Sequence, residues 1–152
     1  MRTISVSRDI PASRAAVWGV LADFPNIADW NSGVKKSFST SESVEGVGAQ
    51  RHCDLAPAGK LEETVVGWQP EEQLVIRIDS AATLPIKTGE VTFSLVEDGD
   101  FTATSVDYDF ETKFGPIGSL MGPMIEKQLT KGFTGFLDDL EAAAKNHSAS
   151  AD

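Results

Sequence analysis

Three side chains place polar or ionisable groups on strands whose other inward residues are apolar, and these are the residues that could do chemistry. They are Arg51, Glu63 and Tyr108. A charge on an apolar face is costly unless it is paired or serves a ligand. Arg51 and Glu63 are predicted to lie diagonally across neighbouring strands, where a charge-assisted pair could orient a ligand carboxylate, hydroxyl or carbonyl. A purely structural ion pair, partly wet near the open end of the sheet, is the alternative.

Proton transfer is the reaction that Glu63 and Tyr108 could support, because burial shifts the pKa of an ionisable group. We therefore name both as candidate catalytic residues. The hydroxyl of Tyr108, like those of Thr102 and Thr104, could also supply a hydrogen bond to a bound molecule. The alternative is that these hydroxyls satisfy each other or a trapped water.

Other kinds of catalytic site have no support in the sequence. It contains no nucleophile elbow, phosphate-binding glycine loop or zinc-binding helix motif. His52 is predicted to point outward and His147 lies in the polar C-terminal segment, so a catalytic triad is not expected. Cys53 is the only cysteine and is predicted to be a small, buried, apolar residue. The sequence therefore predicts no metal, no cofactor and no intrachain disulfide.

The elements that must position these residues follow from hydrophobic periodicity and turn signals. Residues 3–10 alternate as a half-buried strand, and Ser13 is the expected N-cap of a helix. A second short helix starts at Pro25. About six consecutive strands are predicted between residues 33 and 112, joined as a meander, before one long C-terminal helix. The predicted fold class is α+β, built on an antiparallel sheet.

The faces of the sheet follow from strand register. Two strands joined by a tight turn pair residues whose numbers have a constant sum. The predicted pairs include Cys53 with Glu63, Trp68 with Gln73, and Phe93 with Thr104. This pairing gives one continuous apolar face, which the last helix must cover.

The last helix contains two Gly-Pro pairs in "FGPIGSLMGPMIEKQLTKGFTGF", residues 114–136. Pro116 suits a first helical turn, but Pro123 lies further in, frees the carbonyl of Ser119 and predicts a kink. Upstream of the kink, flexible apolar side chains would form a flap over a pocket. These are Ile117, Leu120, Met121 and Met124. The alternative is an ordinary kinked core helix.

Composition limits the partners and the location. The chain of 152 residues has 13 basic and 23 acidic residues, and its formal charge of −10 repels nucleic-acid phosphates and anionic lipids. No apolar run reaches the roughly 18 residues of a membrane span, and the N-terminus lacks the apolar run of a secretion signal. We predict a cytoplasmic protein that neither binds nucleic acid nor inserts into membranes. Residues 1–145 should form a single domain and residues 146–152 a flexible tail.

The order of the predicted elements resembles the START-like, or SRPBCC, superfamily with its helix-grip fold. The segment "IPASRAAVWGVLADFPNIADWNSGV" looks like the opening block of that superfamily, and "GVGAQRHCDLAPAGKLEETVVGWQPEEQLVIRI" resembles its central hairpins. The likeness extends from about Ile4 to Ala144 and is closest to the bacterial polyketide cyclase/dehydrase and lipid transport branch. This resemblance implies a curved sheet of about seven strands, wrapped around a long kinked C-terminal helix and enclosing a ligand cavity.

Three functions are consistent with these observations. The first is binding or transport of a hydrophobic small molecule (lipid, isoprenoid or polyketide-like) in an internal cavity. The second is a polyketide cyclase or dehydratase that uses Glu63 or Tyr108. The third is a protein-interaction role, because "FGPIG" resembles a stretch in mycobacterial members described as toxins of toxin-antitoxin pairs.

The ligand-binding residues expected for the first function share the inward face of the sheet or the first turns of the last helix. They are Arg51, Glu63, Val65, Ile76, Phe93, Thr104, Tyr108, Ile117, Met121, Met124 and Ile125. The sequence leaves open the identity of the ligand, any antitoxin-like partner and the oligomeric state.

Overall fold

The computed structural model describes residues 1–82 and 84–151, with side chains described as far as residue 147. In chain order, the elements are β1 (Arg2–Ile10), α1 (Arg14–Ala22), the 3₁₀ helix η1 (Phe24–Asp29), β2 (Val34–Ser39), β3 (Gln50–Leu55), β4 (Lys60–Gln69), β5 (Gln73–Ser80), β6 (Ile86–Asp98), β7 (Phe101–Thr112), α2 (Gly115–Leu120) and α3 (Gly122–Ala151). The predicted order of strand, two short helices, six strands and one long kinked terminal helix is confirmed, and the kink divides that helix into α2 and α3.

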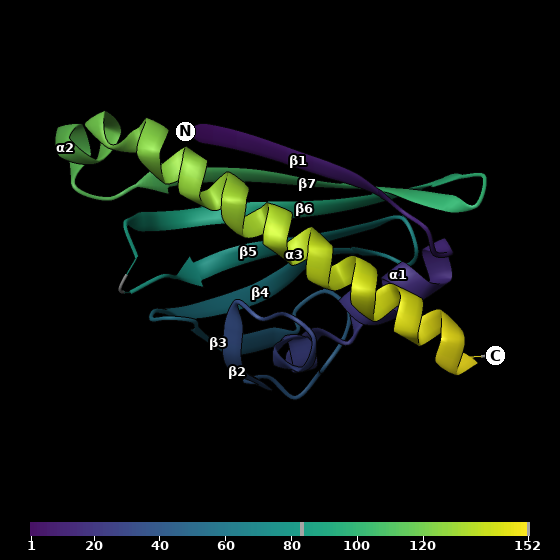
Figure 1. Ribbon diagram of the computed structural model, residues 1–152. Helices are drawn as coiled ribbons and strands as arrows, with labels where there is room; N and C mark the ends of the chain where they lie inside the picture. The colour runs from purple at the N-terminus through teal and green to yellow at the C-terminus, as the bar shows by residue number, and fades with distance from the viewer. Residues whose placement is uncertain (83, 152) are drawn as a thin grey trace.

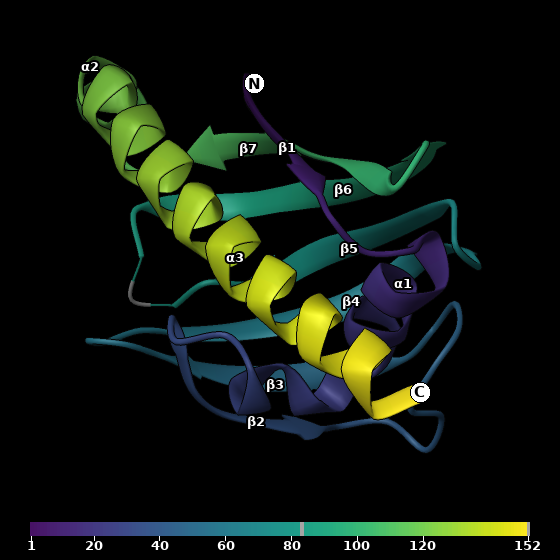
Figure 2. The same cartoon turned by 45° about the vertical axis from the view of Figure 1, so that its right-hand side comes forward.

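The strands form one seven-stranded sheet in the order β1-β7-β6-β5-β4-β3-β2, and every neighbouring pair is antiparallel. Helix α3 runs diagonally across one face of the sheet, and α1 lies beside the C-terminal half of α3 (Figures 1 and 2). This arrangement confirms the predicted helix-grip fold.

Strand pairing preserves the predicted inward faces but corrects the register of two hairpins. Across β3 and β4, Arg51 lies directly opposite Glu63 instead of diagonally, because pairing ends further from the loop than predicted. Across β6 and β7, Phe93 pairs with Val106 rather than with Thr104. Each correction is a shift of two residues, and such a shift leaves the same side chains on the same face.

The β4–β5 hairpin departs from the predicted register near its turn and again at its far end, where Glu62 lies opposite Ser80. Trp68 lies opposite Leu74 rather than Gln73, because an irregularity of the β-bulge type interrupts β4 between Val65 and Gly67. Beyond it, Val65 lies opposite Ile76 in the predicted register.

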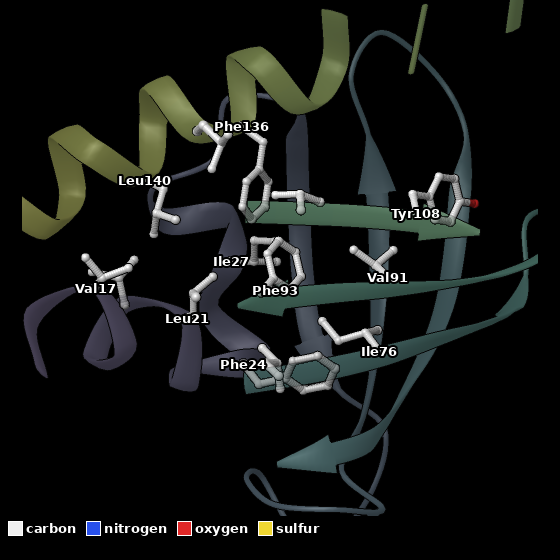
Figure 3. Close-up of a cluster of buried hydrophobic side chains, with 14 of the residues drawn as sticks. Val17, Leu21, Phe24, Ile27, Ile76, Val91, Phe93, Tyr108, Phe136 and Leu140 are labelled. Carbon is white, nitrogen blue, oxygen red and sulfur yellow. The ribbon is translucent and has the colours of Figure 1, made fainter. Parts of the chain in front are cut away.

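Helix α1 begins where the sequence indicates. The side chain of Ser13 accepts a hydrogen bond of 3.1 Å from the amide of Ala16, which is the predicted N-cap. Val17 and Leu21 of α1 are buried and lie below Leu140 of α3 in Figure 3. Helix α1 therefore closes one end of the space between the sheet and α3.

The predicted kink lies between α2 and α3, at the second Gly-Pro pair. Pro123 leaves the carbonyl of Ser119 without its helical donor, and this carbonyl accepts a hydrogen bond of 2.9 Å from the guanidinium of Arg2. That guanidinium lies against Gly122, where an added Cβ would collide with it, and it pairs with Glu126 at 3.3 Å. The Gly-Pro pair thus makes room for a side chain of β1 that stabilises the bend.

The C-terminal end of α3 remains helical to Ala151. The ring of His147 lies against Gly19 of α1, where an added Cβ would come within 2.7 Å of its Nε2 atom. Most side chains of the predicted flexible tail, residues 146–152, lie outside the described part of the chain. The flexibility of this tail therefore stays a prediction.

Candidate ligand-binding site

A cavity of about 240 Å³ lies between the inward face of the sheet and the middle of α3. Its floor includes Ile76, Ile78, Val91 and Phe93 from β5 and β6, and its roof includes Leu129, Phe133 and Phe136 from α3. Figure 3 shows Phe136 pointing from α3 toward Phe93 on the sheet. Leu55, Leu61 and Leu129 are only partly buried, so the cavity opens between the β3–β4 hairpin and α3.

Arg51 and Glu63 form an ion pair on one wall of this cavity. Nε of Arg51 donates to Oε1 of Glu63 at 2.9 Å, and Nη1 donates to the carbonyl oxygen of Phe24 at 2.8 Å. The guanidinium carbon also lies 4.0 Å from the centre of the Phe24 ring. The two side chains are only 6% and 7% exposed, so the backbone and ring of η1 hold a largely desolvated pair in place.

Part of each charged group is available to the cavity. Besides Arg51, the thiol of Cys53 donates to Glu63 Oε1, at 3.5 Å. Within residues 1–82 and 84–147, no group donates to Glu63 Oε2 or accepts from Arg51 Nη2, yet neither atom is among the fully buried polar atoms that lack a partner. Both atoms therefore keep some accessible surface, and both residues line the cavity.

Cys53 lines the cavity beside this pair. Burial, with the charge of Glu63 nearby, raises the pKa of its thiol from 9.0 to about 12. The thiol is therefore neutral at physiological pH and a poor nucleophile. Its exposure of 1% confirms the prediction of a small buried residue.

Tyr108 is buried but does not line the cavity. Its ring lies against Gly89, where an added Cβ would come within 2.8 Å of the hydroxyl oxygen. In Figure 3 the hydroxyl points away from Phe93 and Phe136. Burial raises the pKa of this hydroxyl, so it stays protonated, and no residue of the described part hydrogen-bonds to it. Of the two candidate catalytic residues, the structure places Glu63 at the cavity and Tyr108 away from it.

The structure brings together four of the residues that the sequence suggested for ligand binding. Arg51, Glu63, Ile76 and Phe93 line the cavity. Val65, Thr104, Tyr108 and Ile125 are buried outside its lining. Thr104 donates to the carbonyl of Thr102, and the side chain of Thr102 donates to the carbonyl of Ala12, so the protein itself satisfies these two threonine hydroxyls.

The structure places the predicted flap residues away from the cavity. Ile117, Met121 and Met124 do not line the cavity and are 66%, 40% and 51% exposed. Helix α2 projects past the end of the sheet, on the side where the N-terminus lies (Figure 1). The "FGPIG" stretch lies here, with Phe114 exposed; the interaction role inferred from it stays a prediction. The cover of the cavity comes instead from α3, on the C-terminal side of the kink.

Several cavity residues were not named as ligand-binding from the sequence. Leu129, Phe133 and Phe136 lie on the same apolar stripe as the suggested helix residues, one to three turns further along. The stripe was visible, but the part of it that faces the cavity depends on where the kink places the helix. No sequence pattern indicates that the Phe24 carbonyl accepts a hydrogen bond from Arg51, because any residue type can supply a backbone acceptor.

The outer face of the β3–β4 hairpin carries a second charged cluster. When its ring is protonated, His52 donates from Nδ1 to Glu62 and from Nε2 to Asp54, the latter at 2.8 Å, and the ring stacks on Phe38. The hydrogen bond to Glu62, followed by that to Asp54, raises the pKa of His52, and the bond to His52 lowers the pKa of Asp54. His52 points away from the cavity, as predicted.

A seven-stranded antiparallel sheet that grips a long helix around a ligand-sized cavity defines a START-like ligand-binding fold. Residues 1–145 match the family described as "Polyketide cyclase / dehydrase and lipid transport", and the chain belongs to this family. Among curated protein sequences, none matches the chain.

Solved structures from several bacteria share the fold. TTHA0849 from Thermus thermophilus is 16% identical, with 97% of this chain and 99% of that chain covered and a TM-score of 0.81. A START superfamily protein from Mycobacterium smegmatis is 21% identical, with 95% and 97% covered and a TM-score of 0.79. The Zhui aromatase/cyclase from a Streptomyces species is 18% identical, with 95% and 93% covered and a TM-score of 0.77. At these identities the likeness concerns the fold.

No helix within residues 1–82 and 84–151 is long and apolar enough to cross a membrane. The same part of the chain holds no group of three or more His, Cys, Asp or Glu residues arranged to bind a metal ion.

Proposed function

We propose that this protein binds a hydrophobic small molecule, such as a lipid, isoprenoid or polyketide-like compound, in the cavity between its sheet and α3. The proposal rests on the mostly apolar lining of this cavity. Among the described residues that line it, the charged ones are Arg51 and Glu63, and they lie together on one wall. Ligand pockets typically combine apolar walls with a few polar groups that orient the ligand.

The size of the cavity supports occupancy. Protein interiors are close-packed, and voids larger than a water molecule are few. Because the cavity of about 240 Å³ opens to solvent, its apolar side chains are left in contact with water, at a cost of roughly 25 cal/mol per Å² of apolar surface. A bound apolar molecule would offset this cost. A cytoplasmic setting is supported by the single cysteine, which reducing conditions would leave as a free thiol, and a bacterial one by the bacterial sources of the similar structures.

Two glycines of α3 offer a matched test. Gly132 and Gly135 both have open space where a Cβ would be added, and leucine at either position raises helix propensity by about 1 kcal/mol. Gly132 lines the cavity and Gly135 does not. Gly132→Leu should therefore narrow the cavity, and Gly135→Leu is its control.

The measurement is native mass spectrometry of protein purified from its own host without delipidation, followed by organic extraction. Wild type and Gly135→Leu should carry the same apolar small molecule, and Gly132→Leu should carry several-fold less. A wild-type protein that carries no small molecule and binds no added apolar probe would contradict the proposal.

Catalysis of the cyclase or dehydratase type is the second candidate function. It is favoured by Glu63 Oε2, a carboxylate oxygen that is open to the cavity and could accept a proton from a bound polyketone. Glu63→Gln should then lower turnover by about 10²- to 10⁴-fold. Tyr108→Phe, outside the cavity lining, is the control and should leave turnover unchanged. Equal turnover in wild type and Glu63→Gln would rule out this role.

A further inference from the structure

The polar part of the cavity carries no net charge. Arg51 contributes one positive and Glu63 one negative charge, and the thiol of Cys53 is neutral. The other lining residues within the described part of the chain are apolar, amide-bearing or glycine. Because the two charges already neutralise each other at 2.9 Å, a charged ligand group would enter a poorly solvated site without a counter-charge of its own.

What the pair leaves free is hydrogen-bonding capacity. Glu63 Oε2 can accept one hydrogen bond from the cavity side, and Arg51 Nη2 can donate one. A ligand hydroxyl can donate to the first, and a ligand carbonyl or hydroxyl oxygen can accept from the second. A ligand carboxylate that accepted a hydrogen bond from Arg51 would lie beside the like charge of Glu63. A ligand ammonium group that donated a hydrogen bond to Glu63 would lie beside the like charge of Arg51.

The apolar walls limit the rest of the ligand. A dry cavity of roughly 150 Å³ lined by Leu, Ile and Phe holds benzene, so a cavity of about 240 Å³ suits a molecule about the size of two fused rings. Aromatic surface is available in this space, since Phe93 and Phe136 stack with centroids 5.3 Å apart. A flat, rigid skeleton fits these walls better than a long acyl chain.

Building on the proposed function, we propose that the ligand is a neutral compound of about two fused rings that carries a hydroxyl or carbonyl group. The hydroxyl or carbonyl hydrogen-bonds to the free edge of the Arg51–Glu63 pair. The same pair selects against carboxylates and phosphates of the same skeleton, so fatty acids and phospholipids are not the ligands of this cavity.

Three probes with one carbon skeleton test this selectivity: naphthalene, 2-naphthol and 2-naphthoate, titrated calorimetrically into dialysed full-length protein at neutral pH. Naphthalene reports the apolar cavity itself. The hydroxyl of 2-naphthol should tighten binding about tenfold, the effect of one hydrogen bond to a charged group. The carboxylate of 2-naphthoate should weaken binding by about tenfold or more relative to naphthalene.

Two variants show whether the charge pair is the cause. Glu63→Gln leaves Arg51 unbalanced, so 2-naphthoate should become the tightest of the three probes. Arg51→Met combined with Glu63→Leu removes both charges; it should keep naphthalene binding and lose the preference for 2-naphthol. Met124→Ala, exposed and outside the cavity lining, is the control and should bind the probes in the wild-type order.

The outcomes separate this inference from the proposed function. If 2-naphthoate binds wild type as tightly as 2-naphthol, the inference is overturned while naphthalene binding still supports the cavity. A double variant that binds naphthalene and keeps the 2-naphthol preference also overturns it, and this result does not depend on the single variant folding. If none of the three probes binds wild type, the proposed function fails and the inference with it.

Discussion

Two neighbouring charge pairs on the β3–β4 hairpin lie in different environments, one buried and the other partly exposed to solvent. Arg51 lies opposite Glu63 on the inner face, and His52 lies opposite Glu62 on the outer face. The side chains of the inner pair are 6% and 7% exposed, and those of the outer pair 14% and 45%. Because successive strand residues point to opposite faces, one step along each strand separates a cavity wall from a solvated surface.

The difference shows why an ion pair must be interpreted from its surroundings. The inner pair has lost most of its hydration and retains free hydrogen-bonding edges toward a cavity, so its charges are strongly felt there. The outer pair is screened by water and salt. The same arrangement of a basic and an acidic residue therefore borders a cavity on one face and makes only a surface contact on the other.

Breaking the inner pair should have the largest effect. Arg51→Ala leaves Glu63 buried without its partner, and the free energy of unfolding should fall by about 3–5 kcal/mol. The matched change on the outer face, His52→Ala, should cost a small fraction of that loss. Urea unfolding followed by tryptophan fluorescence measures both. Equal losses would show that the two faces do not differ in the way described.

The dry surroundings of the inner face should also protect Cys53. A thiol pKa raised from 9.0 to about 12 lowers the thiolate fraction near neutral pH roughly a thousandfold, and alkylation depends on the thiolate. Iodoacetamide labelling of the native protein, measured by mass spectrometry, should be slower than labelling of the urea-unfolded protein by about that factor. Labelling of the native thiol at the unfolded rate would be incompatible with this burial.

Removing both inner charges should cost much less than removing one. Arg51→Met combined with Glu63→Leu replaces the pair by apolar side chains, and the free energy of unfolding should lie within about 1 kcal/mol of wild type or above it. Urea unfolding gives the comparison with Arg51→Ala. A loss as large as that of Arg51→Ala would mean that the pair is required for folding itself.

The smallest expected effect is the pH dependence of the outer cluster. Its raised pKa gives His52 a stabilising contribution that is fully present below its ordinary pKa of 6.5 and is lost as the pH rises through the raised value. The lowered pKa of Asp54 gives a contribution present above its ordinary value of 3.8 and lost as the pH falls through the lowered value. Between the ordinary pKa values of 3.8 for Asp54 and 6.5 for His52, both residues stabilise the folded protein.

Thermal melts of wild type and His52→Gln across this range measure the effect. Wild type should lose a little stability from mildly acidic to mildly alkaline pH, and His52→Gln should lose less over the same interval. Identical pH profiles for the two proteins would show that the cluster does not contribute.

Local patterns predicted much of the fold. Alternation along β3 to β7 predicted which side chains face inward, and Ser13 and Pro123 marked the start of α1 and the kink. Loop lengths and the irregularity near Gly67 escaped prediction, because they depend on backbone pairing rather than on polarity. The candidate site was only partly predicted: Arg51 and Glu63 were found, but the flap residues lie outside the cavity.

The sequence by itself determined an antiparallel sheet with one apolar face, a helix able to cover it and a charge pair placed on the inward side, since side-chain direction has a fixed period along each element. Only the tertiary structure decided which part of the helix covers the sheet and whether space remains beneath it. The reason is that the Arg2 contact at the kink and the carbonyl of Phe24 beside Arg51 join segments far apart in the chain. Such contacts leave no periodic trace in either segment.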